Sequence, residues 1–240
     1  MTYHGRDRRA LDRTVAELRD LHGDRLRSVV LVGEAATDDY RARKSPLSLV
    51  VVVDEITPDT LRAMRSHVRR WWRRRVPTPL LLDMLYIESS LDVFALEFLD
   101  MCDRHRVLHG EDPFAGLRID PLHLRMEVEE QMRGKMLHLW EACIGAGRSR
   151  RVLRRVLLDT PPDFEVVLRA MLKLHHEERP HDAETLIAAI EARFDVGLPT
   201  FHRLEAVRAG RERLARGDLD AAFDAYLAEV RSLVRVVDEL

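Results

Sequence analysis

Two short apolar runs near the start of the chain constrain its fold more than any other feature. The first covers residues 28–32 and ends at Gly33, and the second, residues 47–53, is apolar at nearly every position. Runs of this length between turn residues predict strands, and a strand that is apolar on both faces is typical of the centre of a covered sheet. The polar segment between the runs predicts a helical turn and a loop. We therefore expect a strand, a helical turn, a loop and a second strand in this order.

Signals for helices and strands alternate through the rest of the first half. A helix is predicted at residues 6–21, where apolar residues recur every three or four positions. A second is predicted at residues 57–75, because Pro58 suits the first turn of a helix and Pro77 and Pro79 follow its end. Further strands are predicted at residues 80–85 and 94–101. This alternation indicates an N-terminal domain that combines a sheet with helices, and we place it at residues 1–117.

From Pro121 onward the strand signals stop, and six helices are predicted. They are a long helix that ends near Gly145, followed by residues 150–158, 163–175, 182–194, 199–209 and 218–240. An all-helical bundle over residues 118–240 follows from this pattern. Gly134 lies inside the long helix, where glycine costs ~1 kcal/mol relative to alanine. We expect it to mark a close helix crossing, and the alternative is the wall of a cleft.

The residues around Gly33 and the start of the second run carry a motif. The first run ends in Val32, Gly33 and Glu34, eleven residues follow, and the second run opens with Pro46, Leu47, Ser48 and Leu49. This layout resembles the nucleotidyltransferase superfamily, the polymerase-β-like group that includes the minimal and the aminoglycoside nucleotidyltransferases. The signature of that family is a hydrophobic residue with Gly-Ser or Gly-Gly, a spacer of similar length, and aspartates that alternate with hydrophobic residues. Residues 105–112 add a second, shorter similarity to the segment that closes that domain.

The resemblance implies an α+β fold, in which a mixed sheet with flanking helices precedes an all-helical C-terminal bundle. In the aminoglycoside enzymes such a bundle helps to build the acceptor site. The alternating aspartates of the family share one face of a strand, because strand side chains repeat with a period of two, and they hold magnesium against the nucleotide phosphates. The resemblance also implies that Gly33 stands where the nucleotide binds.

Three residues depart from the family motif. Pro46 offers no side-chain ligand and Ser48 offers a neutral hydroxyl, whereas magnesium is usually held by one or two carboxylates together with phosphate. Glu34 takes the position of the small residue that lets the triphosphate approach the first N–H groups of a helix. A carboxylate ~4 Å from a phosphate charge costs about 4 kcal/mol at an effective dielectric near 20. An acid in the first turn of a helix also complements the helix dipole, so all three substitutions are compatible with folding.

We interpret the chain as a nucleotidyltransferase-fold protein whose active site is degenerate and which acts as an interaction or regulatory module. No metal site and no cofactor are expected, and the partner is another protein or a second copy of the chain. The alternative is an active nucleotidyltransferase that uses magnesium to transfer a nucleoside monophosphate from a nucleoside triphosphate to a small molecule or protein. It would rely on relocated acids, for which the candidates are Asp38, Asp39 and Asp83.

A third possibility is RNA binding through residues 69–75, where Trp71 and Trp72 stand among five arginines. Arginines can neutralise phosphates while aromatic rings stack on bases. The run also lies at the end of a predicted helix, where cations meet the helix dipole favourably and one tryptophan can face the core. The net charge of −2 argues against a generally basic protein, so a nucleic-acid partner is not expected.

Composition points to a cytoplasmic protein. No apolar run approaches the ~20 residues that span a bilayer, so no membrane association is expected. The N-terminal residues are charged and lack the apolar core of a secretory signal. Cys102 and Cys143 are far apart in the sequence and predict neither a disulfide framework nor a zinc site.

Overall fold

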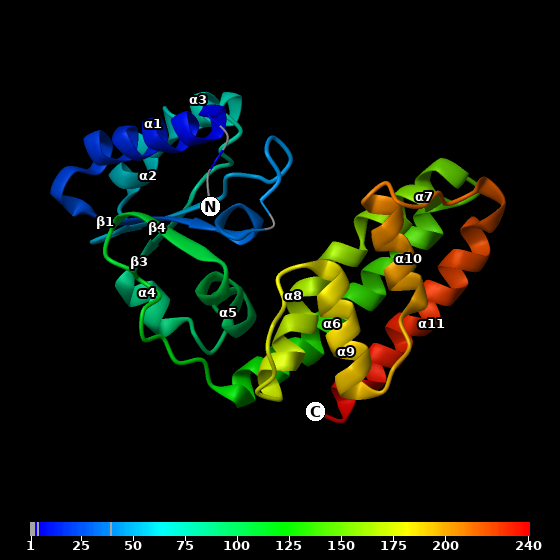
Figure 1. The fold of residues 1–240 in the computed structure, drawn as a ribbon. Coiled ribbons are helices and arrows are strands. Elements are labelled where there is room, and N and C mark those ends of the chain that lie inside the picture. The colour runs from blue at the N-terminus through cyan, green and yellow to red at the C-terminus, as the bar shows by residue number, and fades with distance from the viewer. Residues whose placement is uncertain (1–2, 4, 39) are drawn as a thin grey trace. The chain divides into compact units, whose positions relative to one another are not determined.

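The two apolar runs form the central strands of a four-stranded sheet (Figure 1). In the computed structural model, which describes Tyr3 and residues 5–38 and 40–240, β1 (Leu26–Val32) and β2 (Leu49–Val53) pair antiparallel. Every residue of β2 is buried. The prediction of a strand covered on both faces is therefore confirmed.

Two further strands complete a mixed sheet in the order β3-β2-β1-β4. β3 (Leu80–Asp83) pairs parallel to β2, and β4 (His105–Gly110) pairs antiparallel to β1. Gly110 has a φ of +80°, and a Cβ added there would lie 1.8 Å from the carbonyl oxygen of Arg27. Glycine is therefore required where β4 ends against β1.

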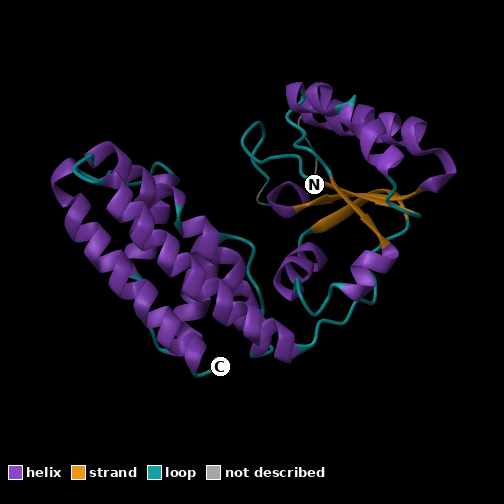
Figure 2. Ribbon diagram, turned by 180° about the vertical axis from the view of Figure 1, so that it is seen from behind, coloured by secondary structure: helices purple, strands orange, loops and turns teal. Residues whose placement is uncertain are grey.

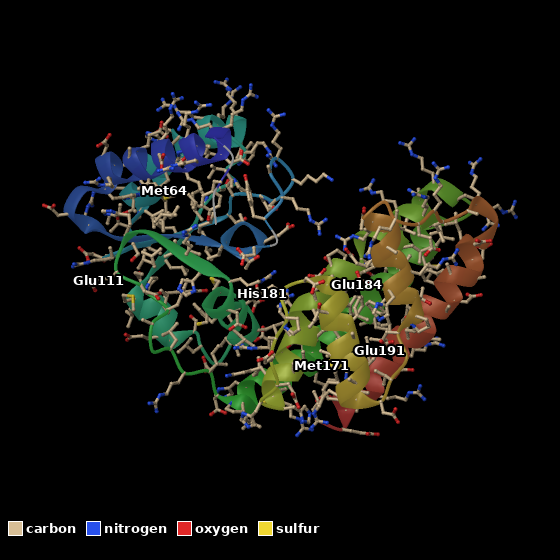
Figure 3. All side chains as sticks on the ribbon, viewed as in Figure 1. Met64, Glu111, Met171, His181, Glu184 and Glu191 are labelled. Carbon is tan, nitrogen blue, oxygen red and sulfur yellow. The ribbon has the colours of Figure 1, made fainter. Side chains whose placement is uncertain are left out.

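Helices cover both faces of this sheet (Figure 2). One face carries α1 (Gly5–His22), α2 (Pro58–Arg65) and α3 (Val68–Arg73), and the other carries α4 (Met84–Ser89) and α5 (Ala95–Asp103). The short 3₁₀ turns η1 (Gly23–Arg25) and η2 (Gly33–Ala36) flank β1. Alternate strand residues enter two cores, since successive side chains of a strand point to opposite faces. The first core includes Leu18, Val29, Val51, Met64 (labelled in Figure 3) and Trp71, and the second includes Val30, Val50, Ile87 and Phe98.

The strand predicted at residues 94–101 is wrong, because this segment forms α5. Leu96 and Phe98 suggested a period of two, but Ala95 and Leu99 are buried with them. Together these residues have the spacing of one face of a helix. The single helix predicted at residues 57–75 is also divided, into α2 and α3.

The third predicted strand ends earlier than residue 85. Asp83 ends β3, and its side chain accepts a hydrogen bond from the backbone N–H of Tyr86 at 2.7 Å. This bond makes Asp83 the N-cap of α4. A side chain that satisfies a free N–H group of a helix stabilises the start of that helix, so the chain leaves the sheet at this point.

The chain divides into two units, Met1–Ile119 and Asp120–Leu240. The second unit is an all-helical bundle, as predicted. Its helices are α6 (Pro121–Ala146), α7 (Arg150–Asp159), α8 (Pro161–Leu174), α9 (Ala183–Phe194), α10 (Pro199–Arg208) and α11 (Leu219–Asp238), with the 3₁₀ turn η3 (Arg216–Asp218) before the last.

Aromatic side chains from three helices meet in the core of the bundle. The rings of Phe164, Phe201 and Tyr226 pack together with centroids 5.0 to 6.3 Å apart. The predicted close crossing at Gly134 is wrong, because a Cβ added there would meet nothing within 4 Å. None of the helices in the described residues combines the length and the apolar character that a membrane span needs.

Candidate functional site

The sheet brings the two halves of the motif together at one end of β1 and β2. Leu31 is opposite Leu49 in the register, and the N–H of Val32 donates to the carbonyl oxygen of Ser48 at 3.0 Å. Gly33 therefore lies beside Ser48, as the motif requires. This end of the sheet is the candidate site that the sequence indicates, and we call it the Gly33 site.

Gly33 has a backbone role in this site. Its φ of +76° lies in the left-handed region that favours glycine, while a Cβ there would meet nothing within 4 Å. Its N–H donates to the carbonyl oxygen of Arg104 at 2.8 Å. The four residues of η2 then form a 3₁₀ turn, which supplies a much smaller dipole than a full α-helix.

Glu34 has a partner that the sequence did not indicate. Its Oε1 lies 3.5 Å from Nε of Arg41, and the two side chains are 36% and 54% exposed. Exposed ion pairs contribute ~0 to 1 kcal/mol, so the pair adds little to folding. The positive charge of Arg41 partly offsets the negative charge of Glu34 at this end of the sheet.

The loop before β2 carries Pro46 and Ser48, and a hydrogen bond within the loop orders the turn that precedes them. Ser45 is buried, and its Oγ accepts the N–H of Arg41 at 2.8 Å. Pro46 is exposed and Ser48 is half-buried. Within the described part of the chain, no group of three or more histidine, cysteine, aspartate or glutamate side chains converges where a metal ion would fit.

Asp83, one of the candidate relocated acids, lies away from the Gly33 site. Asp83 is opposite Val53 in the parallel register of β2 and β3, five residues beyond Ser48, which is ~17 Å at ~3.3 Å per residue. It therefore lies toward the other end of the sheet and caps α4. Asp38 is exposed in the turn after η2. Asp39 lies outside the described residues.

The run at residues 69–75 has two parts. Its first residues pack against α1, and its last residues line a cavity. Trp71 is fully buried, and its indole N–H donates to Glu17 of α1 at 2.9 Å. Arg70 and Arg74 form ion pairs with the same carboxylate at 3.3 and 2.9 Å. The prediction that one tryptophan faces the core is confirmed.

The end of this run also lines a cavity of about 520 Å³, which we call the basic cavity. Side chains that end in nitrogen gather beside α1 and α3 in Figure 3. Among the described residues, the lining includes Asp7, Ala10 and seven arginines. The arginines that line it are Arg6, Arg9, Arg13, Arg43, Arg73, Arg74 and Arg75. Sequence reasoning missed this cavity, because its arginines come from three separate segments.

Comparison with known proteins identifies the fold. The sequence matches no protein-family model, and no curated protein matches it. Among solved structures, the chain is similar to spectinomycin adenyltransferase AAD(9) from Enterococcus faecialis, which was crystallised with ATP and spectinomycin. The TM-score is 0.56 at 10% sequence identity, and the match covers 93% of this chain and 99% of that chain. The α+β nucleotidyltransferase fold predicted from the sequence is therefore confirmed.

Proposed function

We propose that this nucleotidyltransferase-fold protein does not transfer nucleotides at the Gly33 site and acts as an interaction or regulatory module. One observation carries the proposal. Beside Gly33, at the positions where the family motif has aspartates, the chain has Pro46 and Ser48. A proline ring and a neutral hydroxyl do not replace the carboxylates that hold magnesium against a triphosphate.

The surroundings of these residues support the same proposal. The N–H of Gly33 is hydrogen-bonded to Arg104, so this donor is not free for a phosphate. Asp83 is ~17 Å along the sheet from Ser48, by the ~3.3 Å rise of a strand residue, and its carboxylate already caps α4.

A restoring variant gives the sharpest test of metal binding. We expect calorimetric titration of the wild-type protein with ATP to show no binding that is strengthened by magnesium. Pro46→Asp combined with Ser48→Asp should introduce magnesium-dependent binding, because both positions are accessible and adjacent to Gly33. The matched control is Pro46→Asn with Ser48→Asn, which adds similar volume without charge. Micromolar, magnesium-dependent binding of ATP to the wild-type protein would overturn the proposal.

A transfer assay tests the active alternative directly. Wild-type protein, labelled ATP, magnesium and a cell extract should give no more labelled product than heat-denatured protein. The informative variant is Asp83→Asn, since asparagine is also a good N-cap and preserves the start of α4. A labelled product that this variant abolishes would establish the enzyme and contradict the proposal.

Exposed apolar side chains support the interaction role. Leu80, Met84, Leu85 and Tyr86 are between 38% and 77% exposed on β3 and α4, and β3 is an edge strand. Exposed apolar patches and unpaired strand edges favour contacts with other chains.

Sedimentation velocity over a range of concentrations separates the two kinds of partner. A mass that rises with concentration identifies a second copy, and a constant monomer mass leaves another protein as the partner.

A further inference from the structure

We propose that the basic cavity is a binding site for a small anion that carries a chain of phosphate groups, such as a nucleoside triphosphate or inorganic tripolyphosphate. Among the described residues, Gly33, Glu34, Pro46 and Ser48 do not line this cavity, although Arg43 belongs to the spacer between the two halves of the motif. Binding there needs no metal ion. The proposal goes beyond the proposed function, because it assigns a ligand to arginines that the nucleotidyltransferase signature does not contain.

The fold concentrates like charges in this cavity from three segments. Arg6, Arg9 and Arg13 recur at three- and four-residue spacing, which places them on one face of α1. Arg43 comes from the loop before β2, and the end of α3 adds three consecutive arginines. Guanidinium groups that line one cavity attract the same anion, so a bound anion would be stabilised by several of them together.

The protein supplies few anions to these arginines. Arg74 pairs with Glu17 at 2.9 Å. Among the described residues, the guanidinium groups of the other lining arginines have no acidic partner within 4.0 Å. Asp7 is the one acid in the described lining. It is 4% exposed and already accepts the hydroxyl of Tyr40 at 2.5 Å and the N–H of Arg43 at 3.3 Å.

Two of the arginines are held in an unfavourable backbone conformation. Arg43 and Arg75 have φ of 64° and 67°, in the left-handed region that costs a non-glycine residue ~1 to 3 kcal/mol. Arg75 follows the C-cap of α3, a position where glycine is usual. Packing and the helix ending therefore hold the backbone of Arg43 and Arg75 in one conformation, which fixes where their side chains leave the chain.

Two guanidinium nitrogens also lack hydrogen-bond acceptors. Nη1 of Arg74 and Nη1 of Arg75 are buried without a partner among the described residues. A buried donor without an acceptor costs about 1 to 3 kcal/mol. Rotation of the Arg75 guanidinium toward the cavity would let a phosphate oxygen accept its hydrogen bond, while Arg74 keeps its ion pair with Glu17.

The chemistry of the lining selects the class of ligand. Guanidinium groups bind phosphate through two parallel hydrogen bonds, and a volume of about 520 Å³ lies within the range of small-molecule sites. Single-stranded nucleic acid would require aromatic rings for base stacking. Trp71 is buried in the core, whereas Trp72 is 61% exposed and its indole N–H donates to Thr78. Neither ring lines the cavity, and the described lining contains no aromatic residue. A small polyphosphate therefore fits better than RNA.

Calorimetric titration with chelator present, so that no divalent metal contributes, tests the proposal. The probes are sodium tripolyphosphate, ATP and orthophosphate, in about 0.1 M salt, where the Debye length is ~10 Å. We expect one tripolyphosphate per chain, bound at least about tenfold more tightly than orthophosphate, because several guanidinium groups engage one chain of phosphates. Equal affinity for ATP identifies the phosphate chain as the recognised group, and tighter binding of ATP identifies a nucleoside triphosphate.

Two variants of equal charge locate the binding. The cavity variant combines Arg9→Gln, Arg43→Gln and Arg73→Gln, and the control combines Arg8→Gln, Arg62→Gln and Arg65→Gln, none of which lines the cavity. The cavity variant should lose roughly tenfold or more of the tripolyphosphate affinity, while the control should stay close to wild type.

Thermal melting provides a second measurement, because a ligand that binds the folded state raises the Tm. Tripolyphosphate should raise the Tm of the wild type and the control but not that of the cavity variant. Equal affinities in the two variants, or tighter binding of single-stranded RNA than of tripolyphosphate, would overturn the proposal. Neither outcome involves magnesium, so neither bears on the Gly33 site.

Discussion

The hydroxyl of Tyr40 donates a hydrogen bond of 2.5 Å to the carboxylate of Asp7, a residue of α1 that is 4% exposed. Tyr40 lies in the loop between the two halves of the motif, and the N–H of Arg43 in the same loop donates to the same carboxylate at 3.3 Å. Asp7 therefore anchors this loop to the N-terminal helix. The anchor determines where Arg41 and Arg43 lie, beside Glu34 and in the basic cavity respectively.

Loss of the Tyr40 hydroxyl should destabilise the protein. Tyr40→Phe leaves a buried carboxylate with one donor fewer, and hydrogen bonds to charged groups contribute ~1.5 to 3 kcal/mol. We expect a decrease of about that size in the free energy of unfolding, measured by urea denaturation. Tyr3→Phe is the matched control, because its hydroxyl makes a longer contact of 3.4 Å with Arg106. Equal stability of the two variants would contradict the anchoring role.

Glu17 should make stability depend on pH in the acid range. Burial alone would raise the pKa of Glu17, but hydrogen bonds from Arg74, Trp71 and Arg70 outweigh it, so the pKa is lowered from its ordinary value of 4.5. The folded state then binds fewer protons than the unfolded state below that value. The stabilisation is fully present above pH 4.5 and is lost as the pH falls through the lowered pKa.

Urea denaturation at a series of pH values measures this effect. Glu17→Gln should be less stable than wild type at pH 7, and the difference should shrink below pH 4.5. Glu17→Ala should cost about 1 to 3 kcal/mol more than Glu17→Gln, because it leaves the buried indole N–H of Trp71 without an acceptor. A difference between wild type and Glu17→Gln that does not change with pH would refute the charged role of this carboxylate.

Alanine at two glycines should have opposite effects. Gly110→Ala places a Cβ 1.8 Å from the backbone of Arg27 and requires a φ of +80°, so we expect a loss of about 3 kcal/mol or more. Gly134→Ala adds a methyl group where nothing lies within 4 Å, and alanine in a helix interior is favoured by ~1 kcal/mol. The Tm of both variants, measured by thermal melting, tests the pair. A higher Tm for Gly110→Ala than for wild type would contradict the pairing of β4 with β1.

Asp83 should behave as a helix cap. Asp83→Ala removes the acceptor for the N–H of Tyr86 and should cost ~1 kcal/mol, whereas Asp83→Asn should cost a few tenths at most. Chemical denaturation of the two variants measures the difference. Equal losses in both would indicate that the negative charge matters more than the cap.

Local sequence patterns were sufficient for elements whose signals lie within a few residues. The uniformly apolar residues of β2 predicted a central strand, and the apolar spacing in the second half predicted the helices of the bundle. The pattern failed at α5, because Leu96 and Phe98 satisfy a period of two as well as a helical face. Burial of Ala95 and Leu99 decides between them, and burial depends on the neighbouring elements.

The sequence by itself indicated the α+β fold, because the order of apolar runs and helical spacings can be read along the chain. It also showed directly that Pro46 and Ser48 stand where the family motif has carboxylates. Only the tertiary structure decided which distant side chains meet. It paired Glu34 with Arg41 and positioned Asp83 away from Gly33. It also brought arginines from α1, the loop before β2 and the end of α3 into one cavity. The physical reason is that periodicity reports which face of an element is buried, whereas register and helix packing determine what that face contacts.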